Sequence, residues 1–152
     1  MSMRLYNLNG DTSMVKLTSE MKEDIKKLKT MPLATASKSG IPNVVPVAIV
    51  KIDDSDSKDD YVHIMNNFFL KTMANLKENP KVAIYIWSPE TVGCIQMKGE
   101  LVDIISKGAI HEGMKEFALS VNPTLPMKET IRIKITEIFN CAIGKEAGQR
   151  IA

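Results

Sequence analysis

At 152 residues the chain is long enough for one domain with its own hydrophobic core. Hydrophobic residues make up 44% and charged residues 25%, an ordinary globular composition, so disorder is not expected. The 20 basic and 18 acidic residues are interspersed and give a net charge of +2, which argues against a nucleic-acid-binding surface or a polybasic membrane patch.

The sequence also limits the compartment and the metal chemistry. The longest apolar run, residues 44–50, is too short to span a membrane, and no secretory apolar segment follows Arg4. We therefore expect a cytoplasmic protein. Cys94 and Cys141 fall in separate predicted strands, without Cys-x-x-Cys spacing or histidines at ligand spacing, so we predict free buried thiols and no metal site.

Residues 1–16 show no sustained hydrophobic period and are expected to form a flexible N-terminal arm, with one domain over residues 17–152. A helix is predicted to begin near Thr18 or Ser19 and to end before the Met-Pro pair at 31–32. Acidic residues fill its first turns and lysines its last, as the helix dipole favours. Met21, Ile25 and Leu28 form its apolar stripe.

Two strands are predicted next, over residues 33–37 and 42–52, joined by a turn at 38–40. The second is apolar on both faces and should be covered on both sides. Pro46 donates no ladder hydrogen bond, which indicates an edge strand, a bulge, or a place where a ligand takes up free backbone groups. An edge position is the simplest of these.

Residues 53–60 contain five aspartates. A calcium loop of the EF-hand type is not predicted, because the segment has neither the turn glycine nor the bidentate glutamate in register. A solvated hairpin loop is the simplest interpretation.

The segment 61–87 predicts a short strand, a helix ending at Asn79-Pro80, and a second strand over 82–87. Asn66 and Asn67 are expected to cap the helix. Its apolar stripe would contain Phe69, Met73 and Leu76.

That stripe would leave Lys71 and Thr72 in the first turn but off the buried face. A lysine there opposes the positive end of the helix dipole. A cation, a hydroxyl and free backbone amides at one helix N-terminus can bind a phosphate, whereas a solvated surface lysine explains the position equally well.

The strand at 82–87 is apolar on both faces, so a partner subunit is expected to cover one of them. A long strand over 91–105 is interrupted by Gly99, as at a bulge or a close backbone approach. A helix over 108–121 follows, with Ile110, Met114, Phe117 and Val121 on its apolar face. The last strand is predicted over 129–139. About six strands joined by short turns indicate a closed antiparallel barrel with helices outside it.

Three motifs occur in order: the hairpin pieces 33–36, 40–42 and 45–47, the segment 70–82 from Leu70-Lys71-Thr72 through Asn79-Pro80 to Val82, and Gln96-Met97-Lys98-Gly99. Together they resemble the pyridoxamine 5'-phosphate oxidase-like, FMN-binding split-barrel superfamily, over residues 17 to about 147. The resemblance implies a mainly β fold with flanking helices, a six-stranded antiparallel split β-barrel that forms a homodimer and binds FMN.

The resemblance also implies cofactor contacts. The FMN phosphate would lie against Lys71, Thr72 and the local amides, and Gln96 would lie near the ring, from the same or the second subunit. The isoalloxazine edge would follow one strand, with two residues of its neighbour beside it: Val45, Pro46, Val47 and Ala48, then Met65 and Asn66. No catalytic acid or base is predicted, because His63 is interpreted as a strand side chain and His111 as a surface helix side chain.

This sequence departs from the oxidases of the superfamily, which place arginines where this chain has Val45 and Leu70. Their C-terminal substrate-binding segment has no counterpart after Ile131. The chain is more similar to flavoredoxin-type and other small FMN proteins. We therefore predict an FMN oxidoreductase or electron-transfer protein, not a pyridoxamine phosphate oxidase, served by a redox partner protein or a small-molecule electron donor. A deazaflavin-dependent reductase and a non-catalytic module for FMN or haem are the alternatives.

Overall fold

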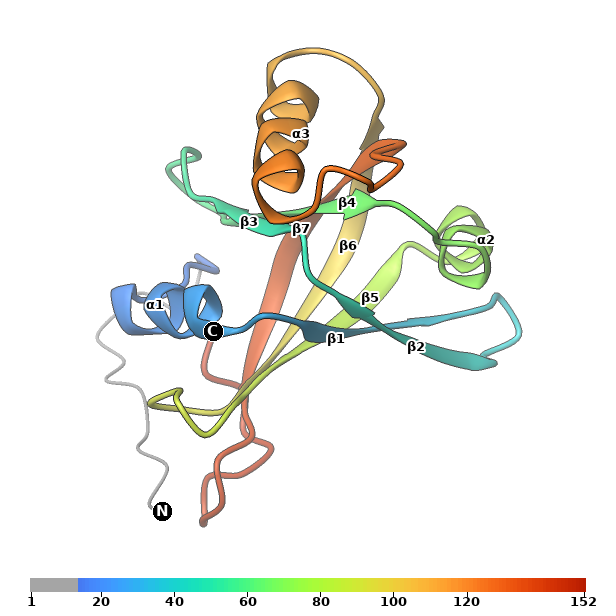
Figure 1. Cartoon of the computed structure of the whole chain (residues 1–152). Helices are drawn as coiled ribbons and strands as arrows, with labels where there is room; N and C mark the ends of the chain where they lie inside the picture. Colours follow the sequence, from blue (N-terminus) through green and yellow to red (C-terminus); the bar gives the residue numbers. More distant parts are fainter. Residues whose placement is uncertain (1–13) are drawn as a thin grey trace.

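The computed structural model describes residues 14–152 (Figure 1). Helices and strands follow in the order α1 Ser19–Lys27, β1 Met31–Ala36, β2 Pro42–Val47, β3 Val50–Asp53, β4 Tyr61–Asn66, α2 Lys71–Glu78, β5 Lys81–Ile86, β6 Ile95–Ile105, α3 Ala109–Val121 and β7 Glu129–Asn140. The mainly β architecture with flanking helices is the one predicted.

All seven strands belong to one antiparallel sheet in the order β2-β1-β5-β6-β7-β4-β3. Six strands were expected, and the difference arises at Ala48 and Ile49, where the predicted strand 42–52 divides. Its halves, β2 and β3, lie at opposite edges of the sheet. Since two residues join these edges, the sheet must curl back on itself, which confirms the split-barrel class.

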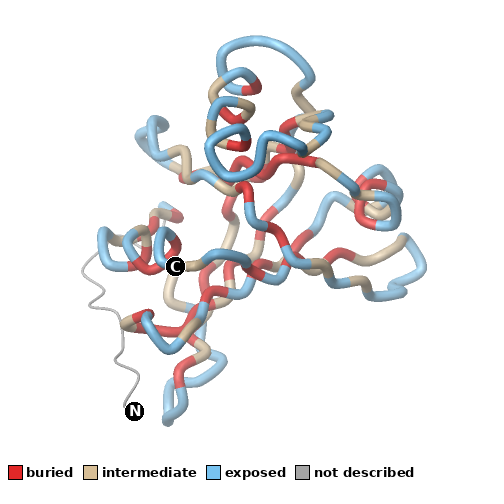
Figure 2. The backbone as a smooth tube through the Cα atoms, in the orientation of Figure 1, coloured by how far each residue is buried: buried red, intermediate tan, exposed pale blue. Residues whose placement is uncertain are grey.

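The core lies inside this curl, where Figure 2 shows the buried backbone concentrated near the strand crossings. The predicted alternation on β7 is confirmed, since Ile131, Ile133 and Ile135 are at most 1% exposed. The interruption at Gly99 is confirmed as well, because the β6–β7 register shifts there. A Cβ on Gly99 would lie 2.5 Å from Ile133 Cγ2 and 2.8 Å from the Lys134 carbonyl oxygen, so only glycine allows this approach.

Helix α1 begins as predicted: Thr18 is its N-cap, and the Thr18 hydroxyl accepts a hydrogen bond from the Met21 amide at 3.2 Å. Of the predicted stripe, Met21 and Ile25 are buried and Leu28 is half-buried. Residues 1–13 of the expected arm lie outside the described part. Residues 14–16, the end of the expected arm, belong to the packed domain. Val15 is buried, and the Lys16 ammonium lies 2.8 Å from an Asp60 carboxylate oxygen.

Helix α2 lacks the predicted asparagine caps. Its N-cap is Leu70, with no side-chain hydrogen bond. The Asn66 side-chain oxygen instead accepts from the Phe69 amide at 3.0 Å, and that of Asn67 accepts from the Met127 amide at 3.1 Å. Both asparagines therefore hold the turn before α2 and its contact with the loop after α3.

Helix α3 is rotated from the predicted orientation. Ile110 and Val121 are 37% and 55% exposed, whereas His111, Met114 and Ala118 are buried. The prediction that His111 lies on the surface is wrong. Its Nδ1 lies 3.0 Å from the Thr130 hydroxyl on β7, which gives the buried ring a polar partner.

Among residues 14–152, none of the helices combines the length and apolar character needed to cross a membrane. Helix α3 packs on β4 and β7, and α2 packs on β1 and β2 (Figure 1). The crossing from β2 to β3 lies between these two ends of the sheet.

Candidate functional site

A cavity of about 360 Å³ opens beside the crossing from β2 to β3, bounded by the turn after β4 and the C-terminal end of α3. This volume falls within the range of roughly 300–1,000 Å³ typical of small-molecule sites. The lining residues are Val45, Pro46, Val47, Ala48, Ile49, Met65, Asn67, Phe68, Phe69, Val121, Asn122 and Leu125. The structure therefore brings together the predicted residues on β2 with Met65 on β4.

One wall of the cavity is the outer edge of the sheet. Strand β2 pairs with β1 on one side and, within the described sheet, with no strand on the other. Pro46 lies opposite Pro32 on this edge strand, so the simplest interpretation of the proline is confirmed. Backbone N–H and C=O groups that point away from β1 lack a ladder partner and can bind the polar edge of a flat ligand.

Lys71 opens α2, two residues after the cavity-lining Phe69. Its side chain is exposed, and the ammonium makes no ion pair with any residue in 14–152. The first intrahelical bond runs from the Ala74 amide to the Leu70 carbonyl at 3.0 Å, so the amides before Ala74 lack helix acceptors. A cation and free amides therefore coincide next to the cavity, as a phosphate requires.

Two predicted site residues have side chains that are more buried than expected. The Thr72 side chain was expected off the buried face, but Thr72 is 1% exposed and its hydroxyl accepts from the Asn43 amide group at 3.1 Å. Asn66 is 3% exposed, and its Nδ2 donates to Glu129 Oε2 at 2.9 Å. Both side chains help to hold α2 and β4, and their contacts with FMN stay predictions.

Gln96 lies away from the cavity. Its neighbours Ile95 and Met97 are buried, so the half-buried Gln96 points to the outer face of β6, beside Tyr85 on β5 and Phe139 on β7. The same face forms a wider depression of about 670 Å³ that includes Lys98. One chain alone therefore does not bring Gln96 to the residues on β2.

This outer face carries the apolar side chains that the pattern of 82–87 predicted. Val44, Tyr85 and Trp87 are 65%, 37% and 41% exposed. They lie on β2, β5 and just after β5, on the side opposite to the barrel core. The single chain leaves them uncovered.

Among residues 14–152, none that lines the 360 Å³ cavity has an ionisable side chain. His63 lies on another part of β4, is 7% exposed, and has its Nε2 3.5 Å from Asp53 Oδ2. Burial lowers the pKa of His63 below its usual 6.5, against the opposing effect of Asp53. The described walls of the cavity thus offer an apolar surface and backbone polar groups.

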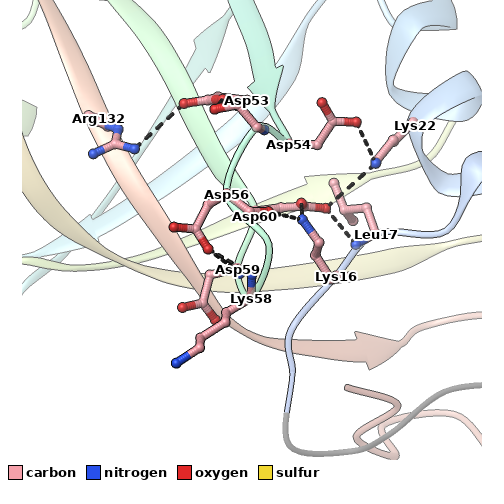
Figure 3. A network of polar contacts seen from close by, with 11 residues as sticks. Lys16, Leu17, Lys22, Asp53, Asp54, Asp56, Lys58, Asp59, Asp60 and Arg132 are labelled. Atoms are coloured by element: carbon pink, nitrogen blue, oxygen red, sulfur yellow. Dashed lines mark hydrogen bonds and ion pairs between the residues drawn. The ribbon is translucent and has the colours of Figure 1, made fainter.

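Most carboxylates of the aspartate-rich loop are directed toward cations. Within residues 14–152, no group of three or more histidine, cysteine, aspartate or glutamate side chains is placed to hold an ion. Figure 3 shows the carboxylates of Asp54 and Asp60 turned toward lysines. The solvated-loop interpretation therefore holds for part of the loop, whereas Asp60 is fully buried.

Residues 17–142 match the family described as pyridoxamine 5'-phosphate oxidase. The chain belongs to this family. An uncharacterized protein of Methanocaldococcus jannaschii is 37% identical over 147 residues, covering 94% of this chain and 92% of that protein. The family assignment predicted from the motifs is thereby confirmed.

Solved structures share the fold at low sequence identity. An FMN-binding protein from Syntrophomonas wolfei superposes with a TM-score of 0.69 at 17% identity, covering 80% of this chain and 83% of that one. A structure described as an F420 reductase gives 0.60 at 18%, covering 77% and 94%. HutZ, the haem storage protein of Vibrio cholerae, gives 0.53 at 19%, covering 83% and 95%. The family fold thus accommodates different ligands.

The cavity also contains residues that the sequence analysis missed. Ile49, Asn67, Phe68 and Phe69 are close in sequence to predicted residues, so extending each motif by a few positions would have included them. The wall from the end of α3, at 121–125, has no such signal because only the tertiary packing places it there.

Proposed function

We propose that this protein is a homodimeric FMN-binding flavoprotein that acts as an oxidoreductase or electron-transfer protein. The observation that carries the proposal is the placement of the unpaired Lys71 and the α2 amides beside a cavity whose wall is the unpaired edge of β2. The phosphate of FMN would then face Lys71 and the α2 amides, and its ring would face the edge of β2.

The residues present fit this group. The exposed backbone edge from Val45 to Ala48 offers polar atoms to the ring edge, and Met65 and Phe69 offer apolar contact. Lys71 and the first-turn amides of α2 would hold the phosphate. Bound FMN would supply the electron-transfer chemistry, and the protein would bind it, orient it and limit solvent access.

The outer face of the sheet supports the homodimer. A second copy covering Val44, Tyr85 and Trp87 removes apolar surface from water, which favours association. In such a dimer Gln96 would approach the ring bound by the partner subunit, which accounts for its distance from the cavity of its own chain. The electron donor would then be a redox partner protein or a small molecule that reaches the remaining open side.

Pyridoxamine phosphate oxidation is not part of the proposal. Leu70, 83% exposed at the α2 N-cap, and half-buried Val45 on β2 replace the arginines of the oxidases. Without these two arginines, the site has fewer cations to bind the phosphate of a substrate in addition to the phosphate of FMN.

A second candidate follows from the absence of ionisable side chains in the cavity lining. Without a proton donor or acceptor at the ring, the domain could serve as a store or sensor for FMN or haem. A deazaflavin coenzyme in place of FMN is the third candidate, suggested by the fold shared with an F420 reductase.

One experiment separates these candidates. The full chain is purified without added cofactor, its absorption spectrum is recorded, and the released small molecule is identified by mass spectrometry. FMN, bleached by a nicotinamide donor or a partner reductase and restored by air, supports the proposal. Released haem or deazaflavin contradicts it, and FMN that no physiological donor reduces would favour the store.

A further inference from the structure

The two cysteines of the chain lie directly across from each other on neighbouring strands. Cys94 immediately precedes β6 and Cys141 immediately follows β7. The β6–β7 register pairs Ile95 with Asn140, so the next pair outward is Cys94 with Cys141. The Cys141 amide donates a hydrogen bond to the Cys94 carbonyl at 2.8 Å, which confirms this pairing beyond the strand ends.

This placement brings the two sulfur atoms to the same side of the sheet. Hydrogen-bonded antiparallel partners have Cα atoms about 5.5 Å apart, inside the range of about 4.4–6.8 Å that a disulfide spans. Their Cβ atoms lie up to about 5.5 Å apart, against about 3.5–4.5 Å in a disulfide, so bond formation requires the two segments beyond the ends of β6 and β7 to close by about 1 Å. The sequence contains two cysteines in all, so each has a single possible partner within the chain.

The two thiols differ in access. Cys94 is 1% exposed, and its thiol donates to the Tyr85 hydroxyl at 3.1 Å. In the single chain Cys141 is half-buried, so its sulfur is the one that a small oxidant reaches first. A homodimer that covers the neighbouring Tyr85 would slow this access. Burial and then the adjacent Cys94 raise the pKa of Cys141, while Lys98 lowers it to a smaller extent. The Cys141 thiolate is therefore scarce at neutral pH, and its oxidation should be slow and become faster as pH rises.

We propose that Cys94 and Cys141 form a reversible intramolecular disulfide when the protein meets a peroxide. The Cys141 thiolate attacks one peroxide oxygen, the O–O bond breaks, and the departing hydroxide takes up a proton to become water, leaving a sulfenic acid. The Cys94 thiol then loses its proton and attacks that sulfur, the S–O bond breaks, and a second water leaves. The two sulfur atoms together lose two electrons, which reduce the peroxide.

The segments on either side of this disulfide are each held by hydrogen bonds to another part of the fold. Asp24 on α1 accepts hydrogen bonds from the amides of Val92 and Gly93, just before Cys94. The C-terminal residues bond to the end of β7, with the Asn140 amide donating to the Gln149 carbonyl at 2.9 Å. A disulfide would tie the loop held by α1 to the strand end held by the C-terminal segment.

The test uses the full-length, reduced protein treated with increasing hydrogen peroxide, then alkylated under denaturing conditions and weighed intact. The expected product has lost about 2 Da, resists alkylation and runs as a monomer on a non-reducing denaturing gel. Dithiothreitol should restore two alkylatable thiols. An interchain-linked dimer, a Cys141 sulfinic acid with Cys94 still alkylated, or no oxidation at all would overturn the proposal.

Serine variants assign the order of events. Cys94→Ser should stop at a Cys141 sulfenic acid that dimedone traps, because the resolving thiol is missing. Cys141→Ser should leave Cys94 reduced at the same peroxide concentration, because that thiol is shielded. Equal oxidation of Cys94 in the Cys141→Ser protein would contradict the proposed entry through Cys141. The wild-type mass measurement remains decisive if either variant fails to fold.

Discussion

The two segments that flank β4 contain charged and apolar residues in opposite arrangements. Before the strand, the aspartate-rich loop holds many charges, and most of its carboxylates form ion pairs with cations from other segments: Lys16, Lys22, Arg132 and Lys134. After the strand, the turn into α2 exposes Phe68 and Leu70 at 72% and 83% and ends at Lys71, whose ammonium makes no ion pair within residues 14–152. The segment with the most charged residues is therefore not the candidate site. The candidate site lies beside the segment whose exposed side chains have few partners in the chain.

The pairing before β4 is centred on Asp60. Its carboxylate lies 2.8 Å from the Lys16 ammonium, accepts from the Leu17 amide at 2.8 Å, and lies 3.9 Å from Lys22 (Figure 3). The hydrogen bond to Asp60 raises the pKa of Lys16, and the ion pair with Lys22 lowers that of Asp54. These contacts fasten the segment before α1 to the loop, so the acidic loop stabilises the fold.

Removing the centre of this network should have the largest effect. Asp60→Ala leaves the buried Leu17 amide without its acceptor and removes one of the two acceptors of the Lys16 ammonium, which keeps the Asp56 carbonyl. We expect a loss of about 1–3 kcal/mol in the free energy of unfolding, mainly from the unsatisfied Leu17 amide. Asp60→Asn, which keeps an acceptor, should lose less. Urea denaturation measures both. Asp56→Asn is the control from the same loop, because the exposed Asp56 side chain accepts from the nearby amides of Lys58 and Asp59, and an asparagine oxygen can also accept them. The bond from Lys16 to the Asp56 backbone carbonyl is kept in this variant.

If Asp60→Ala unfolded at the wild-type urea concentration, the loop would not hold the fold together as described. If the loop stabilises the fold and only the segment at α2 binds the cofactor, folded Asp60→Asn should bind FMN as tightly as wild type. A weakened affinity there would place the loop in the binding function and remove the distinction between the two segments.

The opposite pattern is expected for Lys71. Lys71→Ala should weaken FMN binding about 10- to 100-fold, the loss of a charge-assisted contact, while the urea midpoint stays unchanged. Lys77→Ala is the matched control, because Lys77 is an exposed lysine in the last turn of the same helix. Flavin fluorescence titration measures the affinities. Equal FMN affinities for wild type and Lys71→Ala would show that the phosphate lies elsewhere.

Local patterns predicted much of this fold. The Thr18 cap, the turn at Gly40, the interruption at Gly99 and the alternating isoleucines of β7 all depend on residues close in sequence. The division at Ala48 and Ile49 could not be found in this way. Residues 44–50 are uniformly apolar, so no polar residue or glycine marks the point where the chain passes from one sheet edge to the other.

The other wrong predictions concern side chains whose burial depends on contacts with residues distant in sequence. His111 is buried because Thr130 meets its ring, and Thr72 is buried because Asn43 meets its hydroxyl. Asp24 lies in the α1 segment where acidic residues suit the helix dipole, yet it is fully buried. Its carboxylate accepts from the amides of Val92 and Gly93, nearly seventy positions away. A pattern read along one helix contains none of these contacts, so the predicted placement of Thr72 off the buried face was wrong.

The smallest predicted effect adds a charge where the oxidases of the family have one. Leu70→Arg puts a guanidinium beside Lys71, and we expect FMN to bind about 2- to 5-fold more tightly, with the gain shrinking at high salt. Leu70→Gln controls for the loss of the exposed leucine. Riboflavin, which has the ring without the phosphate, should bind all three proteins equally. A gain for riboflavin as large as that for FMN would mean that residue 70 acts on the ring, and would move the phosphate away from the start of α2.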